Sequence, residues 1–307
     1  MDEAWTAFGG PTLALGARGL RERTSVGWTY AEMIGHVRAW HVLTARRLRA
    51  YAQTGAIDLP DAETSRAVFA ELGLAPARAE ALVRAWSTDA FNAAVAEVAA
   101  GASTHGLVPS LFASYRQLRD AVAALSDAQI QAHAEEGRSF VEALVEGNSY
   151  GHYAEHRSEL EPALPRTAAE LVARVDSDWT AVRDAVRRKG RAGLAEPAIE
   201  DWAYKDLLAH LIGWLQDVPR RIAAIRTGSD RPIAGQAEID AYNARSVAER
   251  KLVGPEAIID ELNTSYRLVR DSLIGLSDAE VRDPRIRGLV ATRTYLHWDE
   301  HAEELGR

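Results

Sequence analysis

The sequence of 307 residues contains no cysteine. This absence excludes disulfides, thiolate metal ligands and a cysteine nucleophile. The sequence also lacks any apolar stretch that approaches the roughly 18 residues of a membrane-spanning helix, and its first residues show no signal-peptide pattern. We therefore expect a soluble, cytoplasmic protein that has no membrane partner.

Lysine is scarce as well, and acidic residues outnumber basic ones. The net charge is −8, lysine occurs only at Lys189, Lys205 and Lys251, and there is no basic run or polybasic tail. A nucleic-acid surface depends on lysines and arginines that neutralise phosphates. The composition therefore argues against a nucleic-acid partner.

Residues that favour helices make up most of the sequence. Alanine, leucine, glutamate and arginine dominate, and apolar residues recur at helical spacing. Met33, Val37 and Trp40, for example, lie on one such apolar stripe. Just before them, Thr29 and Glu32 have the spacing of a capping box. Since no segment shows the alternation of a convincing strand, we predict an all-α protein.

Glycine and proline indicate where the helices end. The run Gly9-Gly10-Pro11 is expected to end a short first helix that carries Trp5 inward. A later helix that begins at about Phe140 should carry residues 150–160 and stop at the prolines that follow.

The length of the chain suits two domains, each large enough to bury its own core. Thr167 and Glu170 have the spacing of a helix cap just after Pro165. We therefore place the domain boundary near Pro165, which gives domains of residues 1–165 and 166–307.

One segment of the sequence occurs twice. Tyr150–Leu160 (YGHYAEHRSEL) reappears as Tyr295–Leu305 (YLHWDEHAEEL), and each copy holds two histidines four residues apart. Side chains at this spacing lie one turn apart on the same face of an α-helix. Each pair of imidazoles could therefore share one metal ion.

The two copies belong to a longer internal repeat. At an offset of 174 residues, the first half matches the second at four positions, Trp28/Trp202, Tyr30/Tyr204, His36/His210 and Trp40/Trp214. Further on, the offset is 151 for Asp89–Asn92 against Asp240–Asn243, and 145 for His152 and His156 against His297 and His301. The extra segment of about residues 56–88 in the first half explains the largest step. The pattern predicts an internal duplication in which each half is one helical bundle.

Six of the nine histidines fall into this repeat, as His36, His152 and His156 and again as His210, His297 and His301. Three imidazoles that leave a coordination position open suit a divalent zinc, nickel or iron ion. Such an ion could polarise a carbonyl or lower the pKa of a bound water. The alternative is a buried polar network that both halves inherited.

The letters H-x-x-E-H also match an inverted zinc-protease signature, in which the glutamate is the general base. That signature needs a further glutamate ligand well downstream. The repeat instead supplies a histidine upstream of each pair, so we do not favour a protease.

Several charged residues near the histidines are candidates for binding or catalysis. Glu159 and Glu304 share the stripe of the histidine pairs, and Glu155 and Glu300 lie to one side of it. These carboxylates could orient an imidazole or act as acid or base, and the alternative is a solvated helix end. Arg47 and Arg221 lie close to the helical azimuth of the upstream histidines. These arginines could hold an anionic part of a substrate or cofactor, and the alternative is that they lie at the surface.

The segments GWTYAEMIGHVRAW and DWAYKDLLAHLIGWLQ, followed by GHYAEHRSEL and LHWDEHAEEL, resemble the DinB/YfiT-like superfamily. That superfamily includes metal-dependent thiol S-transferases, the N-terminal domain of mycothiol-dependent maleylpyruvate isomerase and the ClbS/DfsB branch. The resemblance covers essentially the whole chain, once per half. It implies two tandem four-helix bundles with a three-histidine metal site in each. The shortened first helix and the segment of residues 56–88 depart from this pattern and predict a remodelled or covered pocket in the first half.

These observations lead to a metal-dependent transferase or hydrolase that acts on a small electrophilic substrate. Because cysteine is absent, the nucleophile would be water or an external thiol such as mycothiol. The alternative is a ClbS/DfsB-like protein that binds a reactive small molecule without metal catalysis. A third possibility is a structural pseudo-dimer that has no small-molecule site. The resemblance also implies either a monomer that mimics a dimer internally or a homodimer.

Overall fold

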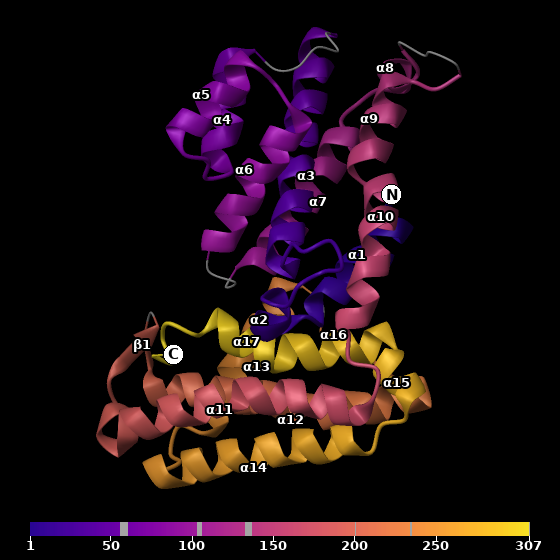
Figure 1. Cartoon of the computed structure of the whole chain (residues 1–307). Helices are drawn as coiled ribbons and strands as arrows, with labels where there is room; N and C mark the ends of the chain where they lie inside the picture. The colour runs from indigo at the N-terminus through magenta and orange to yellow at the C-terminus, as the bar shows by residue number, and fades with distance from the viewer. Residues whose placement is uncertain (56–60, 103–105, 133–136, 200, 234, 307) are drawn as a thin grey trace. The chain divides into compact units, whose positions relative to one another are not determined.

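The computed structural model describes residues 1–55, 61–102, 106–132, 137–199, 201–233 and 235–306. These residues are mostly helical, which confirms the prediction of an all-α protein (Figure 1). Within the described ranges the strands are two very short ones, β1 (Pro197–Ile199) and β2 (Trp202–Ala203), which pair antiparallel. None of the helices in these ranges is long and apolar enough to cross a membrane. The chain divides into two compact units, Met1–Ala163 and Leu164–Arg307.

The first unit is built around a helix of 25 residues, α3 (Tyr30–Thr54). The predicted capping box is present, since the Thr29 side chain accepts from the Glu32 backbone and Glu32 accepts from the Thr29 backbone. Helices α6 and α7 pack along α3. The other helices of this unit are α1 (Asp2–Leu13), α2 (Gly16–Leu20), α4 (Ala62–Glu71), α5 (Pro76–Arg84), α6 (Thr88–Gly101), α7 (Leu107–Ala123), α8 (Asp127–Gln131), α9 (Phe140–Asn148) and α10 (Tyr150–Leu160).

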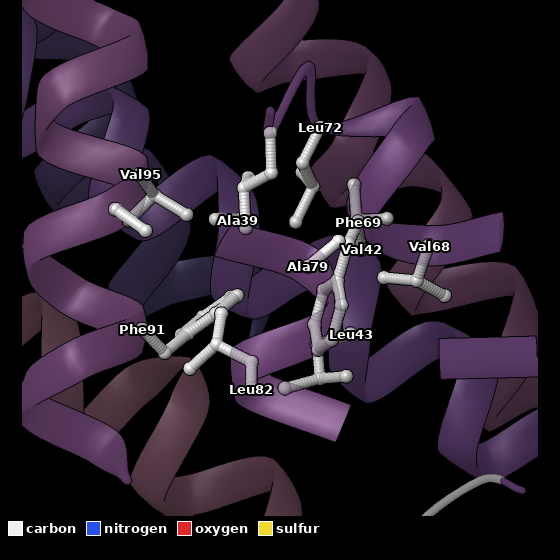
Figure 2. Packing of buried hydrophobic residues seen from close by; sticks show 12 residues of the cluster. Ala39, Val42, Leu43, Val68, Phe69, Leu72, Ala79, Leu82, Phe91 and Val95 are labelled. Atoms are coloured by element: carbon white, nitrogen blue, oxygen red, sulfur yellow. The ribbon is translucent and has the colours of Figure 1, made fainter. Parts of the chain in front are cut away.

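The described part of the extra segment in the first half forms α4 and α5, whereas residues 56–60 lie outside the described ranges. These two helices bury Val68, Phe69 and Leu82 against α3 and α6 (Figure 2). On the α6 side, Phe91 is fully buried in the same cluster. The segment therefore adds a hydrophobic cluster, shared with α3 and α6, to the first unit.

The second unit is built around α12 (Tyr204–Thr227), which packs against α13, α14 and α16. The Asp206 side chain accepts from the backbone N–H of Ala203 at the start of α12, and Gly228 ends the helix with a φ of 70°. The remaining helices of this unit are α11 (Ala168–Gly193), α13 (Gln236–Glu249), α14 (Pro255–Ile274), α15 (Asp278–Arg282), α16 (Pro284–Arg293) and α17 (Tyr295–Glu300).

An aromatic contact occurs in the same form inside each unit. In the first unit, Trp5 stacks on Tyr115 with ring centroids 4.2 Å apart, and the Tyr115 hydroxyl donates to Asp2. In the second unit, the equivalent stack has centroids 4.1 Å apart, and its tyrosine hydroxyl also donates to an aspartate; the residues are Trp179, Tyr266 and Asp176. The offsets of 174 and 151 residues that relate these residues are the offsets of the sequence repeat.

The prediction that Gly9-Gly10-Pro11 ends the first helix was wrong, because α1 continues to Leu13. Gly9 has a packing role inside this helix. A Cβ atom at Gly9 would lie 2.7 Å from the Trp5 indole, so glycine leaves the space that the ring occupies. Trp5 is indeed buried, as expected.

The helix predicted from Phe140 is divided into α9 and α10. Ser149 lies between them with φ −138° and ψ −102°, and its hydroxyl donates to the carbonyl of Val145. The second unit has the same break at Thr294, with φ −125° and ψ −107°, and the Thr294 hydroxyl donates to the carbonyl of Val290 at 2.7 Å. In both units a hydroxyl side chain therefore satisfies a carbonyl next to the break, three residues before the first histidine of the pair.

A buried polar network distinguishes the first unit from the second. His41 is fully buried and its Nε2 lies 2.6 Å from the Tyr153 hydroxyl, while its Nδ1 lies 3.0 Å from the Ser114 hydroxyl. In the second unit, the repeat puts Leu215 and Trp298 at the positions of His41 and Tyr153.

Replacing His41 by leucine should lower the free energy of unfolding by about 1–3 kcal/mol, because the Tyr153 hydroxyl would remain buried without its partner. Urea denaturation of the His41→Leu variant measures this loss. The double variant His41→Leu/Tyr153→Phe should lose less than the sum of the two single variants. Additive losses would contradict a hydrogen bond between these side chains.

Candidate metal centre

In the first unit, the structure brings together the three predicted histidines. His36 comes from α3, and His152 and His156 come from α10. The Nε2 atom of His152 lies 2.8 Å from Nε2 of His36 and 3.0 Å from Nε2 of His156. One potential ligand atom from each ring lies within 4.8 Å of the other two.

The second unit repeats this cluster with His210 from α12 and His297 from α17. Their Nε2 atoms are 2.7 Å apart, and the ring of His301 completes the group within the same 4.8 Å limit. The expectation of a helix through both histidines of this pair needs correction, because α17 ends at Glu300. The His301 backbone N–H still donates to the His297 carbonyl at 3.3 Å, so the spacing of one turn is kept.

Burial keeps the imidazoles neutral. Burial, as the larger cause, and the neighbouring histidines together lower the pKa of His36 and of His210 to about 3. Burial also lowers the pKa of His152 to about 4 and that of His297 well below its usual value. Neutral imidazole is the form that binds a metal ion.

The hydrogen-bonding capacity of the cluster fits a shared cation better than a polar network. A neutral imidazole nitrogen either donates one proton or accepts at one lone pair. His152 Nε2, however, faces two other Nε2 atoms at hydrogen-bonding distance. The buried Nδ1 atoms of His36, His152, His210 and His297 have no hydrogen-bond partner among the described residues, so no neighbour fixes a tautomer that would resolve the conflict. Two such groups could each hold a divalent ion.

An aromatic and amide shell surrounds each group in the same way. Trp28 lies beside His36 with ring centroids 5.1 Å apart, and Trp202 lies beside His210 at the same distance. A second tryptophan lies 6.4 Å from each of these histidines, centroid to centroid, and donates from Nε1 to an asparagine, at 3.0 Å for Trp40 with Asn92 and at 2.9 Å for Trp214 with Asn243. The structure puts Asn243 on the pocket wall.

A cavity of about 680 Å³ opens onto the second group of histidines. All three histidines line it, together with Trp202, Trp214, Ile239, Arg293 and Glu300. Its volume falls in the range of small-molecule sites, which have mostly apolar walls and a few polar groups. The second unit therefore offers room for a ligand next to the three imidazoles.

Of the four carboxylates predicted near the histidines, two face an imidazole. Glu159 Oε1 lies 3.6 Å from Nδ1 of His156, and Glu304 Oε2 lies 3.9 Å from Nδ1 of His301. Glu300 lines the cavity instead. Glu155 is exposed on α10.

Replacing Glu304 by glutamine should weaken zinc binding in the second unit by roughly 10- to 100-fold, because a carboxylate that faces the remote nitrogen of a ligating imidazole makes that ligand more basic. The measurement is competition with a chromophoric chelator in a His36→Ala/His152→Ala background, which leaves only the second group. Glu303→Gln is the matched control, since Glu303 is exposed. Equal affinities of the two glutamine variants would contradict a role for Glu304.

The two arginines suggested by the sequence are engaged elsewhere. The Arg47 guanidinium lies 5.6 Å from the centroid of the Phe140 ring. Arg221 forms a bidentate ion pair with Asp230 at 2.9 and 2.7 Å. The arginine that lines the cavity is Arg293, which the sequence reasoning missed because Asn148 stands at the matching position of the first half. Its position four residues before His297 in the sequence was the signal that could have identified it.

Comparisons of the chain with protein-family models, with curated protein sequences and with solved structures find no match. The functional conclusion therefore depends on the chemistry of the two histidine groups and of the cavity.

Proposed function

We propose that this protein is a divalent-metal-dependent enzyme that acts on a small electrophilic substrate in the cavity of the second unit. The observation that carries this proposal is the convergence of three imidazoles in the lining of a cavity of about 680 Å³. His210, His297 and His301 would hold the ion there. When bound, a zinc, nickel or iron ion would act as a Lewis acid on an electrophilic group of the substrate.

We further propose that the two units are tandem DinB/YfiT-like four-helix bundles that arose by duplication. The support is a set of contacts that recur at the offsets of the sequence repeat. These contacts are the tryptophan–tyrosine stack, the tryptophan–asparagine hydrogen bond, the helix break at Ser149 or Thr294, and the histidine group. Independent origins would not reproduce four unrelated interactions at the same relative positions.

In this proposal, different side chains of the second unit bind the substrate and transfer the proton. Trp202, Trp214 and Ile239 supply apolar walls that hold the body of the substrate. Glu300, the carboxylate of the histidine segment that lines the cavity, is the group we assign to proton transfer. Because the chain has no cysteine, the nucleophile is water or an external thiol such as mycothiol.

The test is a rate measurement on protein loaded with zinc, nickel or iron, using a panel of small electrophiles with and without an added thiol. Turnover should require the metal and should disappear in His210→Ala, while His36→Ala should retain it. The absence of metal-dependent turnover with any substrate of the panel would contradict the proposal.

The second candidate function is a ClbS/DfsB-like protein that binds a reactive small molecule without metal catalysis. Its support is that the apolar walls of the cavity come from side chains other than the three histidines. For this function, ligand affinity should be unchanged when His210, His297 and His301 are all replaced by alanine. A strong loss of affinity in that variant would favour the metal-dependent enzyme.

A further inference from the structure

Arg293 is held in place from two sides at the end of α16. Its guanidinium lies 3.9 Å from the centroid of the Trp214 ring, a close cation–π contact. Its Nε lies 3.4 Å from Oδ2 of Asp217, whose side chain is fully buried. The Arg293 side chain is itself only 18% exposed. This arginine therefore presents a fixed charge rather than a mobile surface one.

The terminal nitrogens of Arg293 remain for a ligand. Among the residues that the structure describes, neither of these two nitrogens makes a hydrogen bond. The side chain lines the same cavity as His210 and His297. The outer edge of a guanidinium matches the two oxygens of a carboxylate and binds it in a bidentate manner.

The acidic side chains near Arg293 do not cancel its preference for a carboxylate. Asp217, the carboxylate that Arg293 contacts, also accepts a hydrogen bond from Arg220 and lies near Arg221. The two acidic residues that line the cavity are Asp240, which accepts from Gln236 at 2.8 Å, and Glu300. Asp217 is therefore shared with other arginines and does not neutralise Arg293 by itself.

The first unit lacks this feature. At the position that matches Arg293, Asn148 donates from Nδ2 to the carbonyl of Leu144 at 2.7 Å, so its side chain is tied to its own helix. The position that matches Arg293 therefore carries a neutral amide in the described part of the first unit.

We propose that Arg293 binds the carboxylate of a small carboxylic acid with an apolar or aromatic body, and so sets the substrate class of the second unit. This inference rests on the proposed function in that it uses the same cavity. In this proposal Trp202, Trp214 and Ile239 contact the apolar body of the ligand, and Arg293 binds its carboxylate. Arg293 is a residue that determines specificity, separate from the metal ligands.

The test compares 3-phenylpropanoate with its neutral amide, 3-phenylpropanamide, by isothermal titration calorimetry on the zinc-loaded protein. The carboxylate should bind roughly 10- to 100-fold more tightly than the amide, the range that a charge-assisted hydrogen bond gives. In Arg293→Asn, which introduces the residue of the first unit, this preference should fall to about twofold or less. Arg231→Asn is the matched control, because it removes the same charge from a side chain that is 88% exposed and lies outside this cavity.

A carboxylate could also bind the metal ion directly, so the same titrations are repeated on protein freed of metal with a chelator. The preference that depends on Arg293 should persist there. An equal affinity for acid and amide in the wild-type protein, an unchanged preference in Arg293→Asn, or no binding of the carboxylate would overturn the inference. Failure of metal uptake with the preference intact would refute only the proposed metal-dependent enzyme.

Discussion

Replacing His297 by alanine should remove most of the stabilisation that zinc gives to the second unit. An ion that binds only the folded state stabilises it by about 4 kcal/mol when its concentration is a thousand times its dissociation constant. The His297→Ala variant lacks one of the three zinc ligands. Its affinity for zinc is therefore lower, and zinc stabilises the folded state less. The quantity to measure is the difference in the free energy of unfolding with and without zinc, because the substitution also changes the packing of a buried site.

Two further variants make this measurement specific to the histidine groups. His152→Ala should remove the corresponding zinc effect from the first unit and leave that of the second unit. His105→Ala, at a histidine that has no counterpart in the other half, should behave as wild type. An unchanged zinc effect in His297→Ala would contradict the second site.

Acidification should destabilise the metal-free protein steeply below about pH 6.5. Burial lowers the pKa of His210 from 6.5 to about 3. Between these two values the unfolded chain binds a proton that the folded chain does not bind. The free energy of unfolding therefore falls by about 1.4 kcal/mol for each pH unit below 6.5 for each such histidine, and above pH 6.5 it does not change on this account.

The measurement is urea denaturation at a series of pH values from about 7 to about 5, in the presence of a chelator. His210→Asn should show a slope smaller by about 1.4 kcal/mol per pH unit than wild type, because one buried group no longer has to remain unprotonated. Trp202→Phe is the control, since it changes the ring beside His210 without removing a titrating group. Parallel curves for wild type and His210→Asn would contradict the neutral, buried state of this imidazole.

The histidine groups could be predicted from the sequence because the repeat supplied a check that a single motif lacks. His152 and His156 alone have the spacing of many helical histidines. The match of His36 to His210 at a constant offset identified the third member of each group. The sequence also predicted the helix start at Thr29, because capping depends on side chains three residues apart.

The features that the sequence did not predict depend on contacts between distant segments or on local exceptions to helix rules. The cavity is formed by β1, β2, α12, α13, α16 and α17, and its arginine has no counterpart in the repeat. The breaks at Ser149 and Thr294 are stabilised by hydroxyls that bond to carbonyls of the preceding turn, and serine and threonine are too common for this to be a signal. The continuation of α1 through Pro11 reflects packing of Trp5 on Gly9, which outweighs the local preference for a break.

The central claim is that the two groups of histidines bind divalent metal ions, and elemental analysis of protein purified without chelators tests it most directly. The expected result is a divalent zinc, nickel or iron ion in the wild-type protein, with a stoichiometry that approaches two per chain on reconstitution. That stoichiometry should fall by one in His36→Ala and by one in His210→Ala. A wild-type protein that contains no such metal and takes up none on reconstitution would contradict the claim.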